Sequence, residues 1–208
     1  MATMTLYAGG LSPYGRKVRM TAYIKGVMGD IDEKPADTNK GDDALNAHNP
    51  LGKIPCLVLA DGAAVYDSAV ICEYLDTLGA KPVLFPAFAA NGGRDRLRVL
   101  TQGALGDGIL DAALLLVYEK RFRPENMAVQ SWIDRQQARI DRAVALLDKA
   151  PPAFGGTPDY GTVTIAAAIG YLDFRHEGKW RAKAPALVKW LDGFDRSVPA
   201  FGKTRPVA

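Results

Sequence analysis

The first residues that could carry chemistry form the run Ser12-Pro13-Tyr14-Gly15-Arg16, which follows a short β-favouring segment. Serine is a preferred helix N-cap, and proline fits the first helical position because its missing N–H costs nothing there. A helix N-terminus carries unpaired N–H groups and about half a positive charge, so it attracts an anion to that end of the helix. The run therefore predicts either an anion-stabilising hydroxyl or a plain helix cap, and these residues alone do not separate the two.

Composition sets the outer limits on function. The chain has 208 residues, with 26 basic and 23 acidic side chains and a net charge of +3. No basic run indicates a nucleic-acid partner. We find no apolar stretch of membrane-spanning length and no signal-peptide pattern, and Cys56 and Cys72 have neither metal-ligand nor disulfide-framework spacing. We therefore expect a cytoplasmic protein without a metal and without a membrane or nucleic-acid partner.

The first eighty residues predict a small α/β unit. Apolar runs and turn signals alternate with one amphipathic helix pattern that Asp67 and Ser68 cap. The expected strands are 4–7, 29–34, 56–59 and 63–66, and the expected helices are 13–25, 42–47 and 68–78.

Beyond a Pro- and Gly-rich stretch at 80–93, the pattern becomes helical throughout. Gly103, Gly106 and Gly108 interrupt the first long helix and permit a bend or a close approach. A second long helix follows Pro124, and Thr164 is expected to open a helix that is apolar on every side and hence central. A last helix is expected over 185–194.

Three motifs in this order, followed by a helical second half, resemble the cytosolic glutathione transferase family. They are Ser12-Pro-Tyr-Gly-Arg16, Gly52-Lys-Ile-Pro55 and Tyr66-Asp-Ser68. The amino-acid sequences of residues 67–75 and 170–175 are most similar to those of small bacterial members with an active-site serine. The resemblance implies a thioredoxin-like, α/β glutathione-binding domain over 1–80, a linker over 81–93 and an all-helical C-terminal domain over 94–208. It also implies a homodimer.

The resemblance implies a role for each matching position. Ser12 is the catalytic residue, whose hydroxyl hydrogen-bonds the glutathione sulfur. Ile54 precedes the family's cis-proline, Pro55, and its backbone pairs with the cysteinyl part of glutathione. The remaining expected glutathione and substrate contacts are Asp67 and Ser68 at the γ-glutamyl end, Lys53 at the glycyl carboxylate, and Tyr14 lining the pocket of the second substrate.

The expected reaction is attack of the glutathione thiolate on a small apolar electrophile, with peroxide reduction as a second outcome. Lowering a thiol pKa from about 8.5 by roughly two units needs about 2.7 kcal/mol. A hydroxyl donor supplies about 1.5–3 kcal/mol and the helix terminus about 0.5–1. Tyr7 is the alternative thiol activator, because some classes of the family use a tyrosine near the end of the first strand.

Alternatives of other kinds stay open. The chain could be a glutathione-dependent isomerase or dehalogenase, or a non-catalytic interaction domain with this fold. A dithiol redox enzyme is disfavoured, because Ser12 and Gly15 stand where glutaredoxins carry cysteines. Thr164 lacks the acidic partner three residues later that the family's capping box uses. His48 and His176 have no partner spacing for a metal or a catalytic triad, so we expect surface or structural roles for them. The resemblance places Asp107, Asp111 and Tyr118 on the helix that borders the second-substrate pocket, with an exposed or interdomain role as the alternative.

Overall fold

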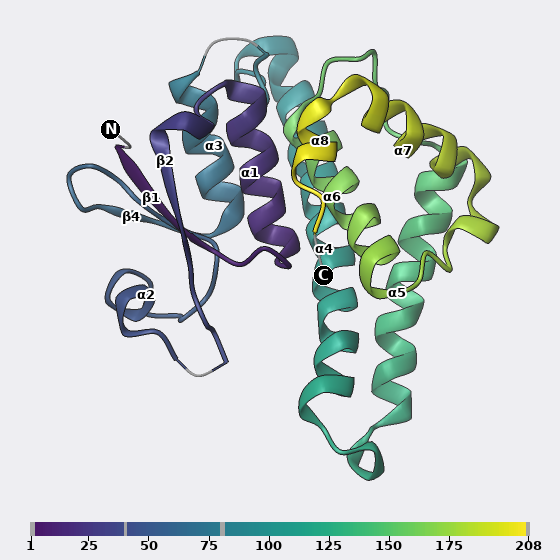
Figure 1. The fold of residues 1–208 in the computed structure, drawn as a ribbon. Helices are drawn as coiled ribbons and strands as arrows, with labels where there is room; N and C mark the ends of the chain where they lie inside the picture. The colour runs from purple at the N-terminus through teal and green to yellow at the C-terminus, as the bar shows by residue number, and fades with distance from the viewer. Residues whose placement is uncertain (1–2, 40, 80–81, 207–208) are drawn as a thin grey trace.

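The computed structural model describes residues 3–39, 41–79 and 82–206, with an α/β layer beside a group of helices (Figure 1). The elements of the first half are β1 (Met4–Ala8), α1 (Pro13–Lys25), β2 (Ile31–Pro35), α2 (Asp43–His48), β3 (Cys56–Val58), β4 (Ala64–Val65) and α3 (Ser68–Leu78). Those of the second half are α4 (Arg94–Phe122), α5 (Gln130–Lys149), α6 (Tyr160–Arg175), α7 (Pro185–Ser197) and α8 (Pro199–Lys203). The predicted thioredoxin-like unit and all-helical unit are confirmed.

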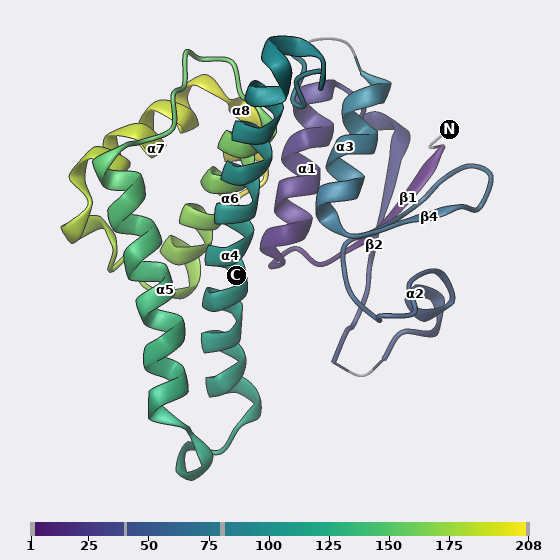
Figure 2. The ribbon, with the colours of Figure 1, turned by 180° about the vertical axis from the view of Figure 1, so that it is seen from behind.

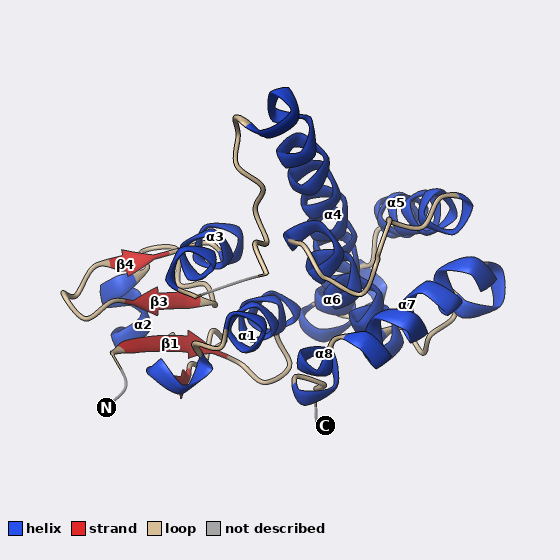
Figure 3. Ribbon diagram, turned by 90° about the horizontal axis from the view of Figure 1, so that it is seen from above, coloured by secondary structure: helices blue, strands red, loops and turns tan. Residues whose placement is uncertain are grey.

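The four strands form one mixed sheet in the order β2-β1-β3-β4. β1 is parallel to β2 and antiparallel to β3, and β4 is antiparallel to β3. Because side chains alternate along a strand, Leu6 and Leu57 pack with α1 and α3 on one face. Tyr7 and Cys56 pack with Leu45 of α2 on the other face. Figure 3 shows this layering, with α1 and α3 between the sheet and the second helical group.

Helix α1 has the bounds that its sequence predicts. Ser12 is the N-cap, Pro13 is the first helical residue, and Gly26 closes the helix with a left-handed φ of 73°. The N–H of Gly26 bonds to Tyr23 O, which satisfies a carbonyl of the last turn.

The central helix α6 is confirmed as buried, but the prediction that Thr164 opens it is wrong. The helix begins at Tyr160, and the Asp159 carboxylate accepts the N–H of Thr162 at 2.8 Å. The Thr162 hydroxyl in turn accepts the N–H of Asp159 at 2.9 Å, so a complete capping box is present. Thr164 lies within the helix and donates its hydroxyl to Tyr160 O at 2.8 Å. The first turn contains Gly161 and two β-branched residues, all of which have low helix propensity. The sequence pattern therefore does not predict that the helix begins at Tyr160.

Helix α4 packs along α6 through two of its glycines. A Cβ atom on Gly103 would lie 2.3 Å from the Tyr160 ring, and one on Gly106 would lie 3.0 Å from the backbone of Thr164. A Cβ atom on Gly108 would meet nothing within 4 Å. The predicted close approach is confirmed for Gly103 and Gly106, and the helix continues through all three glycines.

Residues Asn91–Phe122 correct the expectation that no segment reaches membrane-spanning length. This helix is long and apolar enough to cross a membrane, and part of it is buried inside the protein. Charged residues at both ends of this helix lower the average hydrophobicity of the whole segment, so the apolar stretch between them is easily missed in the sequence. Figure 2 shows that the helix lies between α5 and the layer formed by α1 and α3. The central helices of soluble proteins can be equally long and apolar.

The domain boundary at 81–93 stays a prediction. The backbone N–H groups of Leu84 and Phe85 donate to the Asp76 carboxylate of α3, and both side chains belong to the core beneath α1 and α3. This part of the connecting segment is therefore packed against the first unit.

The glycine contacts predict opposite effects of two neighbouring substitutions in α4. Gly106→Ala should lower the free energy of unfolding by about 1–3 kcal/mol, because the new methyl group pushes α4 away from the backbone of α6. Gly108→Ala should raise it by about 0.5–1 kcal/mol, since this exposed position gains helix propensity without a clash. Urea unfolding of both variants measures the difference, and equal effects at the two positions would contradict the packing described.

Candidate active site

The sheet topology gathers the three predicted motifs at one edge. β1 ends at this edge, the antiparallel β3 begins there, and β4 ends there, as the pairs Tyr7–Cys56 and Leu57–Val65 show. The segments that carry Ser12, Ile54 and Asp67 leave the sheet from these strand ends. Ile54 also reaches the first loop, since a Cβ atom on Gly9 would lie 3.0 Å from its Cδ1 atom.

Ser12 is half-buried at the N-terminus of α1. Its Oγ atom accepts the N–H of Gly15 at 3.2 Å, so its role as a helix cap is confirmed. Accepting this bond leaves the hydroxyl proton free, and among residues 3–39, 41–79 and 82–206 no hydrogen bond donated by Ser12 is found. The same side chain can therefore cap the helix and donate to an anion.

The loop before β3 is held by a buried asparagine that the sequence analysis did not single out. The Asn49 side-chain amide donates to Lys53 O at 2.8 Å, and its oxygen accepts the N–H of Leu51 at 3.1 Å. The peptide bond between Ile54 and Pro55 is cis. Asn49-Pro50 predicts a turn from the sequence, but the sequence does not show that the Asn49 side chain bonds to the backbone of Leu51 and Lys53.

Asp67 and Ser68 begin α3 as predicted. The Asp67 carboxylate accepts the N–H of Ala69 at 3.0 Å, and Ser68 is the first helical residue, with 3% of its surface exposed. A second helix N-terminus, with its unpaired N–H groups, thus lies at the same sheet edge as Ser12.

Tyr7 lies on the other face of the sheet from α1. It packs with Leu45 and Cys56 beneath α2, and its ring centroid is 5.8 Å from that of His48. This side chain therefore points away from the helix that Ser12 caps.

A buried cation of α1 ties the candidate site to the helical unit. Lys17 is fully buried, and its Nζ atom lies 2.7 and 2.9 Å from the two carboxylate oxygens of Asp107 on α4. It also donates to the Tyr160 hydroxyl at 3.2 Å. Burial by itself lowers the pKa of Lys17, but Asp107, Cys72 and Tyr160 together outweigh burial, with Asp107 contributing most, and raise the pKa above its ordinary value. Lys17 is therefore a permanent cation in the interface.

Two further α1 side chains reach the helical unit. The Arg16 guanidinium donates to Phe201 O at 3.0 Å and lies 4.2 Å from the centroid of the Phe201 ring. The Tyr14 hydroxyl donates to the Asp111 carboxylate of α4. Burial and the nearby carboxylate raise the pKa of Tyr14, which keeps the phenol protonated. Asp107 and Asp111 thus have interdomain contacts, whereas Tyr118 is exposed and meets Phe122 edge to face.

Both cysteines are free and buried, as expected of small apolar residues. Burial raises the pKa of Cys56, and it raises that of Cys72 to about 11 although Lys17 opposes the shift. Neither thiol is disposed to act as a nucleophile at neutral pH.

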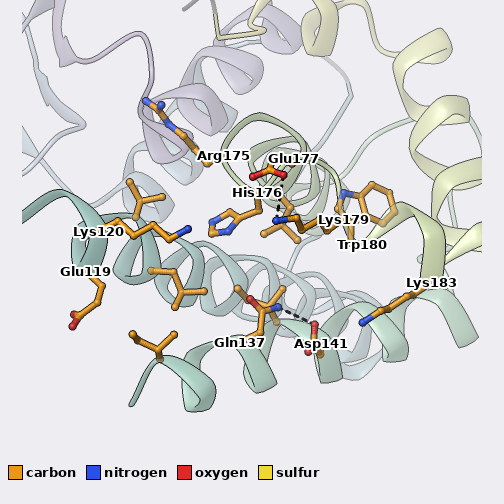
Figure 4. Close-up of a pocket in the computed structure, with 15 residues that line it drawn as sticks. Glu119, Lys120, Gln137, Asp141, Arg175, His176, Glu177, Lys179, Trp180 and Lys183 are labelled. Atoms are coloured by element: carbon orange, nitrogen blue, oxygen red, sulfur yellow. Dashed lines mark hydrogen bonds and ion pairs between the residues drawn. The ribbon is translucent and has the colours of Figure 1, made fainter. Parts of the chain in front are cut away.

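Within the described residues, hollows lie at two places beside the helical unit. A small one beside the predicted catalytic serine is lined by Gly10, Leu11, Ser12, Pro13, Arg16, Tyr171 and Pro206. A larger cavity of about 430 Å³ lies between α4, α5 and the end of α6, and none of the predicted site residues lines it (Figure 4). His176 lies in this cavity with its Nε2 atom 3.1 Å from Ala113 O, which fits a structural role.

The Lys17–Asp107 pair predicts unequal effects of removing its two partners. Asp107→Asn should lower the free energy of unfolding by about 3–5 kcal/mol, because it leaves an uncompensated ammonium in the interior. Lys17→Met should cost less, since the remaining Asp107 carboxylate is 27% exposed and reaches water. Urea unfolding measures both values. Glu177→Gln is the control: it breaks an exposed pair with Lys179 and should cost at most about 1 kcal/mol. A loss in Asp107→Asn no larger than in this control would contradict the buried pair.

Comparisons with known proteins agree with this geometry. Residues 11–78 match the family model of the glutathione S-transferase N-terminal domain, and residues 130–193 match that of the C-terminal domain. An uncharacterized GST-like protein of Escherichia coli K12, YibF, is 32% identical over 98% of each chain.

Solved structures include a glutathione transferase family member from Pseudomonas fluorescens Pf-5. It was crystallised with bound glutathione and is 36% identical, with a TM-score of 0.88 over 99% of this chain and 100% of that one. A second structure of the same bacterium's protein holds S-(propanoic acid)-glutathione. It is 35% identical, with a TM-score of 0.84 over 98% of this chain and 100% of the other.

Proposed function

Because this chain belongs to the glutathione S-transferase family, we propose that it is a glutathione transferase that activates the glutathione thiol with Ser12. The observation that carries the proposal is the Ser12 hydroxyl, which caps α1 as an acceptor and keeps its proton free for a bound sulfur. The relative from Pseudomonas fluorescens, which binds glutathione, supports the choice of thiol. Tyr7 is a weaker candidate because it faces α2.

The other predicted positions would hold the rest of glutathione. The backbone of Ile54, next to cis Pro55, would pair with the cysteinyl part of the tripeptide. The N-terminus of α3 at Ser68 would take the γ-glutamyl carboxylate, with Asp67 near the ammonium. Lys53 would face the glycyl carboxylate.

The energetics of thiol activation are adequate. A free thiol with a pKa of about 8.5 is only a few per cent ionised at pH 7. A charge-assisted bond from Ser12 and the N-terminus of α1 together supply about 2–4 kcal/mol, enough to lower that pKa by between one and three units. The thiolate sulfur would then form a bond to an electrophilic carbon of a small substrate as a leaving group departs or a π bond opens. With an organic peroxide it would break the O–O bond, which releases an alcohol, and a second glutathione would complete the reduction by forming glutathione disulfide and water.

The proposal predicts a pH-dependent loss of activity in Ser12→Ala. At pH 6.5 the conjugation rate with a general electrophile such as chlorodinitrobenzene should fall about 10- to 100-fold, because the thiol pKa returns toward its free value. Above pH 9 the rate should approach that of the unmodified protein, since glutathione is then ionised without help. Ser12→Thr keeps the hydroxyl and should retain most of the activity.

A loss in Ser12→Ala that stays constant over this pH range would contradict thiol activation, because it would indicate general structural damage. Retention on immobilised glutathione by a protein without conjugating activity would instead indicate a non-catalytic glutathione-binding module. Conversion of a defined isomerisable or halogenated substrate without a conjugate would indicate the isomerase or dehalogenase alternative.

We also propose that the protein is a homodimer. Val70 of α3 and Leu97 and Leu100 of α4 are 50%, 56% and 37% exposed, and the ion pair between Glu73 and Arg96 joins the two helices beside them. This apolar surface fits an isologous interface. Light scattering should give about twice the chain mass of 22.4 kDa. Leu97→Glu should lower that mass to one chain, whereas Leu146→Glu, an exposed position of α5, should not.

The free state of both cysteines supports a reducing compartment, and we propose the cytoplasm. Cell fractionation tests this assignment, and recovery in the membrane fraction would contradict it.

A further inference from the structure

Arg16 of α1 is a buried cation with neutral hydrogen-bond partners. Only 4% of the residue is exposed, and its Nη2 atom donates to Phe201 O at 3.0 Å. Its Nε atom lies 3.5 Å from the Thr204 hydroxyl, and no ion pair of Arg16 is found within the described residues. Because an unpaired charge in a protein interior is costly, packing alone does not account for an arginine at this position.

The charges around Arg16 do not balance its own. Burial, followed by the charges of Arg205 and Arg19, lowers the pKa of Arg16 to about 10, so the guanidinium is still a cation at neutral pH. The carboxylates of Asp195 and Asp173 oppose this shift less strongly, and each already pairs with another arginine. The surroundings of Arg16 therefore favour an additional anion.

Arg16 and Ser12 share the small hollow at the start of α1. They are one helical turn apart, a spacing that places two Cβ atoms about 5–6 Å from each other. Both line the hollow together with Tyr171 of α6 and Pro206. Its volume of about 10 Å³ is close to what one water molecule needs. A sulfur held by the Ser12 hydroxyl would therefore feel the charge of Arg16 without full screening by water.

Helix α8 fixes the direction of the Arg16 side chain. Figures 1 and 3 show α8 beside α1. The guanidinium carbon lies 4.2 Å from the centroid of the Phe201 ring, and the Phe201 carbonyl accepts its hydrogen bond. Gly170 of α6 leaves room for the same group, since a Cβ atom there would lie 2.4 Å from Arg16 Nη1. The position of this charge relative to Ser12 therefore depends on the docking of α8.

Two other cations of α1 already have carboxylate partners. The Lys17 Nζ atom lies 2.7 Å from the Asp107 carboxylate, and the Arg19 Nη1 atom lies 2.7 Å from that of Glu33. Each of these pairs is close to neutral as a whole, so neither offers a net positive charge to a ligand.

The other titratable groups near Ser12 are two phenols and one exposed carboxylate. Burial raises the pKa of Tyr14 and of Tyr171, which keeps both protonated. The Asp111 carboxylate accepts the Tyr14 hydroxyl, and its negative charge opposes a thiolate. Asp111 is exposed, however, so water and salt screen its charge more than that of the buried guanidinium. Arg16 therefore acts more strongly than Asp111 on a sulfur at Ser12.

We propose that Arg16 is a second stabiliser of the glutathione thiolate and that α8 holds its guanidinium beside the sulfur at Ser12. This inference rests on the proposed function, because it takes Ser12 as the sulfur site. The hydroxyl and the helix terminus supply a hydrogen bond and a partial charge, and Arg16 adds a full positive charge. The thiol proton passes to water, and Arg16 keeps its own proton throughout. The thiolate thereby supplies the anion that the buried guanidinium lacks.

The pKa of glutathione bound to the full chain, followed by thiolate absorbance, tests this role. Arg16→Gln keeps N–H donors but removes the charge, so the thiol pKa should rise by about one and the thiolate fraction below it should fall about tenfold. Arg16→Lys keeps the charge and should retain most of the lowered pKa. Phe201→Leu removes the ring beside the guanidinium and should raise the thiol pKa by a smaller amount.

Two further substitutions serve as controls. Asp111→Asn removes the opposing negative charge and should lower the thiol pKa. Arg135→Gln removes an exposed positive charge from α5, away from the small hollow, and should leave the thiol pKa unchanged.

An unchanged thiol pKa in Arg16→Gln would overturn the proposal. So would equal rises in Arg16→Gln and Arg16→Lys, because these would indicate a purely structural role. If Arg16→Gln does not fold, Phe201→Leu carries the test, and an unchanged thiol pKa in that variant would overturn the proposal. Failure of the unmodified protein to bind glutathione would contradict the proposed function. An effect of Ser12→Ala without one of Arg16→Gln would contradict only the role of Arg16.

Discussion

The buried contact between Lys17 and Asp107 is the constraint on which the rest of the structure depends. A fully buried ammonium is tolerated only with a partner, so α1 has to pack where α4 supplies a carboxylate. That contact fixes the helix whose N-terminus carries Ser12, and it sets the register between α1 and α4. The position of Ser12 relative to the walls of α4 and α6 follows from this one pairing together with the Gly170–Arg16 contact.

The sheet supplies the second condition for the site. Two β-strand ends and one β-strand start meet at the same edge, so the loops that follow or precede them form one surface. Two helices, α1 and α3, begin at that surface and present their N-termini to it. A thiolate and a carboxylate of one peptide ligand can therefore each meet the positive end of a helix. The fold thus provides anion sites before any charged side chain is added.

Local signals made much of this predictable from the sequence. Ser12, Pro13 and Gly26 are strong start and stop signals, so the bounds of α1 are those of the prediction. The start of α6 could not be predicted in the same way, because the threonine of its capping box replaces the usual acidic residue and Gly161 weakens the helical pattern. A lysine such as Lys17 is expected on the surface from the sequence alone. Its burial depends on the ion pair with Asp107, which lies 90 residues away in the chain.

The character of the second-substrate region was the least predictable part of the site. The sequence analysis expected an apolar second substrate, whereas the Tyr14 hydroxyl beside Ser12 donates to Asp111 of α4, and Tyr171 of α6 lines the hollow next to Ser12. These residues come from different helices, and their convergence depends on the packing of both helices against α1. Their spacing in the sequence carries no sign of it.

The ultraviolet absorbance of bound glutathione as a function of pH tests the central claim most directly. Our account predicts a thiolate band that titrates with a pKa clearly below the value of about 8.5 for a free thiol, and a return toward that value in Ser12→Ala. Bound glutathione that titrates like the free thiol in the unmodified protein would contradict it.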